Sequence, residues 1–91
     1  MASDFQIFSL KTQNSLHLKL TGDFDGSSAH ELINTLIAYS IGLWDIIIDT
    51  NNLKTINPFG IDVFQKNLNN IKKQLRNLII VWANKYKFEQ G

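Results

Sequence analysis

The sequence contains no cysteine, which excludes disulfide bonds, thiolate catalysis and cysteine-based metal sites. Its two histidines, His17 and His30, fall in different predicted elements, whereas a zinc site needs three or four converging ligands. No Gly-Lys-Ser/Thr follows Gly22 and Gly26, so there is no phosphate-binding loop, and no serine stands in a nucleophile elbow. We therefore expect neither a catalytic site nor a cofactor, and the chain is predicted not to be an enzyme.

Long apolar runs and broad basic patches are also missing. The longest apolar run is only a few residues, which is too short to span a membrane, so no direct membrane insertion is expected. Residues Met1–Phe5 do not form a basic-then-apolar signal peptide, and a cytoplasmic location is expected. The net charge is +1, and the basic cluster Lys72, Lys73 and Arg76 falls in the predicted last turn of a helix, where cations complement the helix dipole. Nucleic-acid binding needs a broader basic surface and is not expected.

The chain is predicted to form a single domain, residues 1–91, that opens with a β-hairpin. It is 44% hydrophobic and 19% charged, as is typical of a globular protein. Two alternating segments, Phe5–Lys11 and Leu16–Thr21, flank a polar turn at 12–15. In the second segment the leucines alternate with polar residues, so one face is buried and the other is wet. The predicted buried residues are Leu16, Leu18 and Leu20, and the outward ones are His17, Lys19 and Thr21.

A polar loop over 22–28 is predicted to lead into the first helix. Ser28 and Glu31 have the spacing of a capping box, which places the helix start at Ser28. Gly42 is expected to end the helix in a left-handed conformation. The predicted apolar face of this helix comprises Ala29, Leu32, Ile33, Leu36 and Ile37.

The second half of the chain is predicted to contain a strand, a helix and a final strand. The strand over Trp44–Asp49 is followed by a polar loop, Thr50–Thr55. Asn57 is a good N-cap and Pro58 suits the first helical turn. Asn77 is expected to break the helix before a strand over Leu78–Trp82. The predicted apolar face of the helix comprises Ile61, Phe64, Leu68, Ile71 and Leu75.

The predicted order is strand, strand, helix, strand, helix, strand, which indicates an α/β fold with a mixed sheet. Strands joined through a helix are parallel. If both crossovers move in the same direction, both helices cover one face of the sheet. Ile47, Ile79 and Val81 then lie on the opposite face.

The acidic residues offer few candidate sites. Asp23 and Asp25 flank Phe24 in a glycine-bounded loop, where turn formation is the expected role. Asp49 ends a predicted parallel strand, the position where open α/β sheets bind ligands. We weigh strand termination against ligand contact there, and small-ligand binding near Asp49 is an alternative function.

Four segments in order resemble the STAS (anti-sigma-factor antagonist) family. Leu20–Asp25 is similar to the strand that ends in glycine and a hydrophobic–Asp pair, and Ile46–Asp49 is similar to the central strand. Asn57–Ile61 stands where the family commonly has Asp-Ser-Ser/Thr-Gly-Leu, and Leu78–Val81 resembles the next strand. The resemblance runs from about Phe5 to Trp82 and implies a STAS-like fold and a non-enzymatic interaction function.

The resemblance implies a partner such as an anti-sigma factor or a serine-kinase-like ATPase, bound through two segments. In many members a partner kinase phosphorylates the serine of the helix-start motif, which breaks the complex. Here that position is Pro58, which has no hydroxyl group, so the family switch is absent. Either the sequence has drifted at this position while the fold persists and the proline merely starts the helix, or binding is constitutive or regulated elsewhere, for example at Ser27, Ser28 or Thr55. The predicted partner-binding residues are Asp23, Phe24, Asp25, Gly26, Asn57, Pro58, Phe59 and Gly60.

Two features leave further alternatives open. Phe59 replaces a small hydroxyl residue, and it is either an exposed interface anchor or a side chain tucked under the loop. STAS domains usually continue into a further helix, whereas only 84–91 follow here, so apolar sheet surface is expected to be covered by a second copy, giving a homodimer, or by another chain. The family also includes accessory subunits of membrane ABC transporters, which is a second alternative function.

Overall fold

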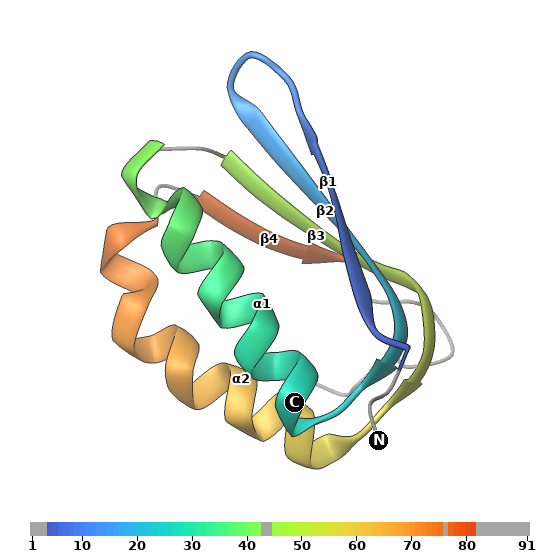
Figure 1. Ribbon diagram of the computed structural model, residues 1–91. Helices are drawn as coiled ribbons and strands as arrows, with labels where there is room; N and C mark the ends of the chain where they lie inside the picture. Colours follow the sequence, from blue (N-terminus) through green and yellow to red (C-terminus); the bar gives the residue numbers. More distant parts are fainter. Residues whose placement is uncertain (1–3, 43–44, 76, 82–91) are drawn as a thin grey trace.

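The computed structural model describes residues 4–42, 45–75 and 77–81. The expectations that concern Trp44, Arg76, Trp82 and 84–91 lie outside the described residues. Figure 1 shows a sheet with two helices packed against it. The elements are β1 (Gln6–Lys11), β2 (Ser15–Phe24), α1 (Gly26–Tyr39), the 3-10 turn η1 (Ser40–Gly42), β3 (Asp45–Ile56), α2 (Pro58–Ile71), the 3-10 turn η2 (Lys72–Gln74) and β4 (Asn77–Val81).

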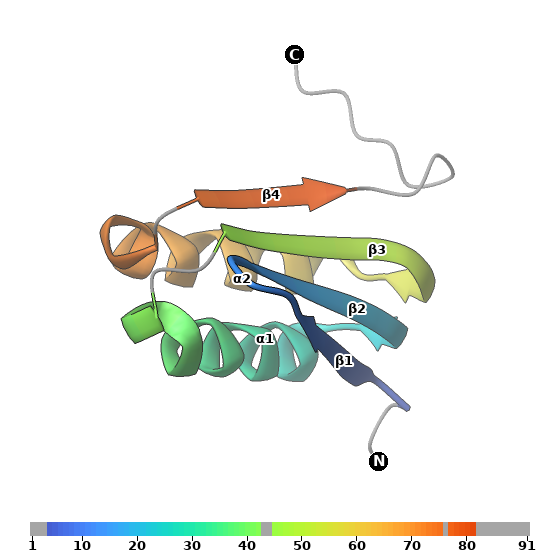
Figure 2. The same ribbon diagram turned by 90° about the horizontal axis from the view of Figure 1, so that it is seen from above.

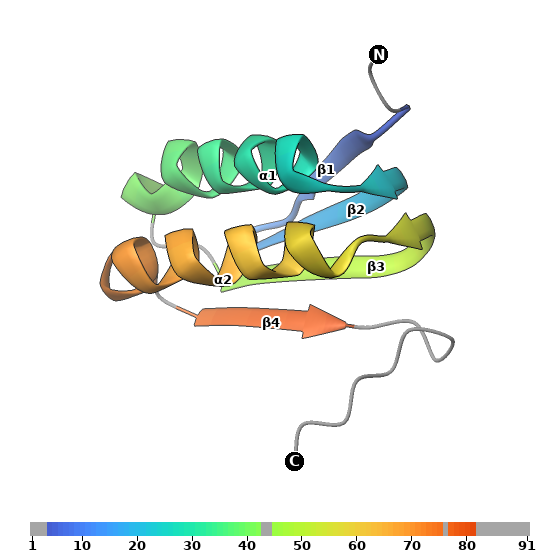
Figure 3. The same cartoon turned by 90° about the horizontal axis from the view of Figure 1, so that it is seen from below.

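The sheet has the predicted mixed topology. Its strands lie in the order β1-β2-β3-β4, so β1 and β4 form the two edges (Figures 2 and 3). β1 is antiparallel to β2, and β3 and β4 are parallel to their neighbours. Both crossovers move in the same direction, and both helices cover one face (Figure 1). The α/β fold with helices on one face is confirmed.

The core lies between that face and the helices. The alternation in β2 is borne out, because Leu16, Leu18 and Leu20 are at most 1% exposed while His17 and Lys19 are exposed. The predicted face of α1 is also buried, with the exception of Ile37, which is 44% exposed. The remaining core residues include Ala29, Leu32, Ile33, Leu36, Ile46, Ile48, Phe64 and Ile71.

β2 and β3 are both longer than predicted, and the predicted loop Thr50–Thr55 is wrong. β3 continues to Ile56 and pairs with the end of β2, after register shifts between Lys19 and Thr21 and between Gly22 and Asp23. These bulges interrupt the alternation of buried and exposed side chains in β3, but they do not end its pairing with β2. Thr50 is buried inside this extension and its hydroxyl donates to the carbonyl of Val81 at 2.7 Å.

The start and end of α1 also differ from prediction. Its N-cap is Asp25, whose side chain accepts from the Ser28 N–H, so Ser28 lies inside the first turn and is not the cap. The helix ends at Tyr39 with Ser40 as a right-handed C-cap, and Gly42 closes the 3-10 turn that follows.

The start of α2 is as predicted, and its end is not. Asn57 is the N-cap and Pro58 is the first helical residue. The helix ends at Ile71, so Leu75 lies beyond it, and Lys72 and Lys73 lie in η2. Asn77 begins β4 and does not interrupt the helix.

The sheet face opposite the helices carries the predicted apolar residues. Ile79 is 57% exposed and Val81 is 39% exposed, while Ile47 is half-buried. Phe8 and Leu10 of β1 are exposed on the same face. Among the described residues, no helix is long and apolar enough to cross a membrane.

Candidate functional site

The two helix starts lie next to each other at one end of the sheet. Phe24 at the end of β2 pairs with Ile56 at the end of β3, and each strand leads directly into a helix (Figure 1). The Asn57 N–H donates to the carbonyl of Phe24 at 2.8 Å, which ties the two connections together. The structure thus brings together the two segments predicted to bind a partner, 23–26 and 57–60.

Gly60 allows the two helix starts to approach at backbone distance. A Cβ at this position would lie 2.9 Å from both the carbonyl carbon and the carbonyl oxygen of Asp25. These are backbone atoms, which cannot move aside as a side-chain end can. Gly60 is buried, and it contributes to the site as a spacer that sets the helix separation.

Phe59 is exposed on one side and supported on the other. Its side chain is 64% exposed. A Cβ on Gly26 would lie 3.0 Å from Phe59 Cε2 and 3.4 Å from Cδ2, so the ring lies across this glycine. The ring therefore rests on the start of α1, and its other side faces solvent. The adjacent Pro58 is also exposed.

Both helix starts are capped from within the chain. The Asp25 carboxylate accepts from the Ser28 N–H at 3.0 Å, and Ser28 Oγ lies 3.0 Å from the same oxygen and 2.7 Å from the carbonyl of Asp23. The backbone hydrogen bond from Ser28, and next the hydroxyl bond, lower the pKa of Asp25. Asn57 Oδ1 accepts from the Phe59 N–H at 2.9 Å. Each helix start therefore has a side-chain cap from its own segment, and hydrogen bonds hold the Asp25 carboxylate at the start of α1.

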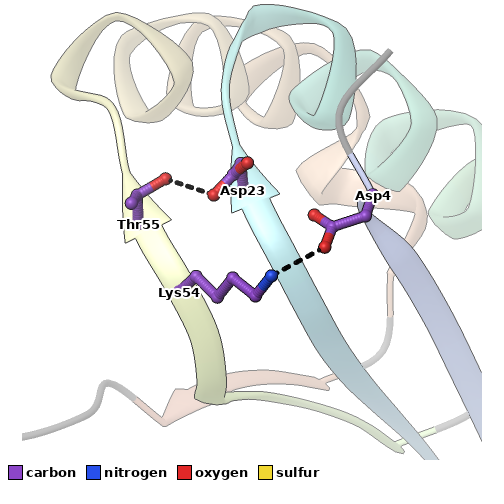
Figure 4. A network of polar contacts seen from close by, with 4 residues as sticks. All are labelled: Asp4, Asp23, Lys54 and Thr55. Atoms are coloured by element: carbon purple, nitrogen blue, oxygen red, sulfur yellow. Dashed lines mark hydrogen bonds and ion pairs between the residues drawn. The ribbon is translucent and has the colours of Figure 1, made fainter.

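A polar network borders this surface on the ends of β2 and β3 (Figure 4). Thr55 Oγ1 donates to Asp23 Oδ1 at 2.8 Å, and Lys54 Nζ lies 2.9 Å from Asp4 Oδ2. The hydrogen bond and the charge of Lys54 lower the pKa of Asp4, and Asp4 raises the pKa of Lys54 in return. Both charged side chains are mostly exposed, so this pair adds little stability. The Asp23 side chain is held by its hydrogen bond to Thr55 on the neighbouring strand, β3.

Phe24 is a correction to the predicted site. It is 3% exposed, and its ring packs edge-on against Phe5 and Phe64, with centroids 5.9 Å and 6.3 Å away. It is a core residue and is not available to a partner in this structure. The signal was present in the sequence, because the alternation of Leu16, Leu18 and Leu20 continues through Gly22 to Phe24.

The alternative phosphorylation positions differ in access. Ser28 is 1% exposed and hydrogen-bonded, so a kinase cannot reach its hydroxyl without opening the helix start. Ser27 and Thr55 are exposed, although Thr55 is hydrogen-bonded to Asp23.

Two contacts of this site were not predicted from the sequence. One is the ion pair between Lys54 and Asp4, which are far apart in the chain. The other is the Thr55–Asp23 hydrogen bond, which depends on strand pairing.

The structure gives no support to ligand binding at Asp49. This residue does not end its strand, because β3 continues to Ile56, and its carboxylate accepts from the Asn51 N–H at 2.9 Å. A cavity inside the core, lined by residues that include Leu20, Phe24 and Leu53, measures only about 10 Å³. That volume holds about one water molecule. Within 4–42, 45–75 and 77–81, no group of acidic or histidine side chains is placed to hold a metal ion.

Comparisons with known proteins identify the fold. No protein-family model and no curated protein matches the chain. Among solved structures, the STAS domain of an antisigma-factor antagonist from Rhodobacter sphaeroides has a TM-score of 0.66 at 11% identity, covering 85% of each chain. A protein with a SpoIIAA-like fold from Shewanella loihica has a TM-score of 0.58 at 13% identity, covering 89% of this chain and 69% of that one.

A third similar structure, that of a protein called Mglu, has a TM-score of 0.73 at 12% identity. The match covers 86% of this chain, which spans only 20% of Mglu. At these identities the similarity establishes architecture and not activity. The chain has a STAS-like, SpoIIAA-like fold, and the helix starts lie where its two connecting segments converge.

Proposed function

We propose that this chain is a non-enzymatic interaction module that binds a regulatory protein at its two helix starts. The binding site, called here the helix-start surface, is the accessible part of the predicted site. Phe24 and Gly60 are left out because they are buried. The surface consists of Asp23, Asp25, Gly26, Asn57, Pro58 and Phe59.

The observation that carries this proposal is the exposed, supported ring of Phe59. Large aromatic side chains dominate the binding energy of protein interfaces when they insert into a pocket on the partner. Because the ring already rests on Gly26, little side-chain entropy remains to be lost on binding. An apolar side chain that is 64% exposed beside exposed Pro58 is suited to such contact.

We infer the class of partner from the resemblance to the STAS family, and the fold supports this inference. A STAS-like architecture shared with an antisigma-factor antagonist supports a regulatory role, with an anti-sigma factor or serine-kinase-like ATPase as the expected partner and the cytoplasm as the expected location. Pro58 has no hydroxyl group to phosphorylate, so we infer that binding is not switched off at this position. Regulation, where it occurs, acts at another residue.

A pull-down from the native lysate tests this proposal. The full chain is used as bait in three forms: wild type, Phe59→Ala and, as control, Ile41→Ala. Ile41 is 89% exposed and lies in η1, beyond the far end of α1. We expect the wild type and the control to retain the same regulatory protein and Phe59→Ala to lose most of it.

Two results would count against the proposal. Equal recovery by all three forms would remove Phe59 from the interface. Recovery of a membrane ABC complex in place of a regulatory protein would favour the alternative of a transporter accessory subunit. Mass spectrometry of the bait in the same experiment reports whether Ser27 or Thr55 carries a phosphate.

A further inference from the structure

We propose that two copies of this chain associate through the outer edges of their β4 strands. The occupant of this edge is a second copy, paired antiparallel about a two-fold axis that passes between the two Ile79 residues. This site is separate from the helix-start surface, and the inference does not depend on the proposed function.

The first argument is that β4 lacks the features that keep an edge strand solitary. Natural edge strands are blunted by lysine, by proline or by a covering element. Asn77–Val81 contains no charged residue and no proline, and three of its five residues are β-branched. Within the described part of the chain, β4 pairs only with β3 and forms the outer edge of the sheet (Figures 2 and 3).

The second argument is an apolar groove along the helix side of this edge. It has a volume of about 410 Å³, and four of its six lining residues are leucine or isoleucine. All four are only half-buried, so each still has apolar surface to cover. A neighbouring strand that places apolar side chains below α2 would fill this groove. Its lining consists of Leu68, Lys72, Leu75, Asn77, Leu78 and Ile80.

The third argument is that β4 is complementary to itself. In antiparallel pairing about Ile79, Leu78 lies opposite the partner's Ile80, and both point to the helix side. Ile79 lies opposite its own copy on the open face, where it is 57% exposed. Aliphatic pairs directly opposite each other are the contacts that stabilise a sheet. A net charge of +1 per copy adds little repulsion between them.

The geometry of this pairing leaves the helix-start surface open. The groove involves Leu68, Lys72 and Leu75, near or just beyond the end of α2, whereas Phe59 lies at its start. A two-fold axis perpendicular to the sheet keeps all helices on the same face of one continuous sheet. The dimer would therefore present two copies of the helix-start surface, so a dimeric partner would be bound with increased avidity.

Sedimentation-velocity centrifugation over a concentration series of the full chain tests this inference. The variant is Ile79→Lys, which puts two like charges opposite each other at the centre of the pairing. The matched control is Leu10→Lys, at a residue 65% exposed on the same face but on the opposite edge strand. We expect a monomer–dimer equilibrium for wild type and control, with a dissociation constant about tenfold or more higher for Ile79→Lys.

Amide chemical shifts of the wild type on dilution provide a second readout that requires no substitution. The inference predicts concentration-dependent shifts in Asn77–Val81 and in the groove residues Leu68 and Leu75. A wild type that stays monomeric up to its solubility limit would overturn the inference. It would also be overturned by a dimer that Leu10→Lys disrupts and Ile79→Lys does not, or by dilution shifts confined to β1.

Discussion

The cap of α1 yields a prediction whose size can be worked out from the structure. Asp25→Ala removes the acceptor of the Ser28 N–H, and loss of such a cap costs about 1 kcal/mol. The Ser28 hydroxyl is buried, but it keeps the Asp23 carbonyl at 2.7 Å as a partner. No further penalty for an unsatisfied buried group is therefore added. Asp25→Asn keeps an acceptor and should cost less.

The assay is urea unfolding followed by circular dichroism. With a slope of roughly 1–3 kcal/mol per molar urea, a loss of about 1 kcal/mol lowers the midpoint by about 0.3–1 M. Asp25→Ala with an unchanged midpoint would refute the assignment of the cap. So would a loss by Asp25→Asn as large as that of the alanine variant, because asparagine is an equally good cap residue.

A comparison of wild type with Asp25→Asn tests whether the negative charge of the cap contributes to stability. The pKa of Asp25 is lowered from 3.8 by its hydrogen bonds, so the folded state binds its proton less readily than the unfolded state. The stabilisation by the carboxylate is therefore complete above the unfolded pKa and is lost as the pH falls through the lower folded pKa. The free-energy advantage of wild type over Asp25→Asn should shrink below about pH 4. A difference that stays constant down to pH 2 would contradict this cause.

Two further pairs of substitutions test the packing. Gly60→Ala should lower the free energy of unfolding by about 1–3 kcal/mol because the new Cβ meets the backbone of Asp25, while Gly26→Ala should lower it less because its Cβ meets only the edge of a side-chain ring. Equal urea midpoints for these two variants would contradict this. Leu18→Ala should lose about 2–5 kcal/mol and the neighbouring His17→Ala less than about 0.5, by the same assay. Similar losses for both would mean that the buried face of β2 is wrongly assigned.

The fold was largely predictable because regular patterns set it. The alternation in β2 and the spacing of apolar residues in the helices report burial directly, and Asn57-Pro58 is a local helix-start signal that needs no tertiary contact. Because both crossovers between parallel strands move in the same direction, both helices lie on one face of the sheet. These features depend on the chain's own periodicity and local chemistry.

The missed features depend on contacts between distant segments. Thr50–Ile56 looks like a polar loop, yet it is a strand because β2 offers it a partner beyond two bulges. Ser28 has the spacing of a capping box, but Asp25 takes the cap because β2 runs as far as Phe24 and the helix begins directly afterwards. In both segments the local sequence is compatible with more than one structure, and the pairing of β2 with β3 determines which one forms.

The candidate site was predicted in outline and corrected in detail. The two segments do meet, as expected from strands that end at one edge of a sheet. The burial of Phe24 continues the alternation of β2, but the contact of the Phe59 ring with Gly26 could not be read from residue types, because it depends on the separation that Gly60 permits between the helices.

The most direct test of the proposed function is a calorimetric titration with the partner purified from the pull-down. Wild type, Phe59→Ala and Ile41→Ala are titrated under identical conditions, after unfolding curves have shown that all three are folded. The proposal predicts that Phe59→Ala weakens binding by about thirtyfold or more, the effect of losing an interface anchor of about 2 kcal/mol or above, while Ile41→Ala binds as wild type does. An unchanged affinity for Phe59→Ala would contradict it.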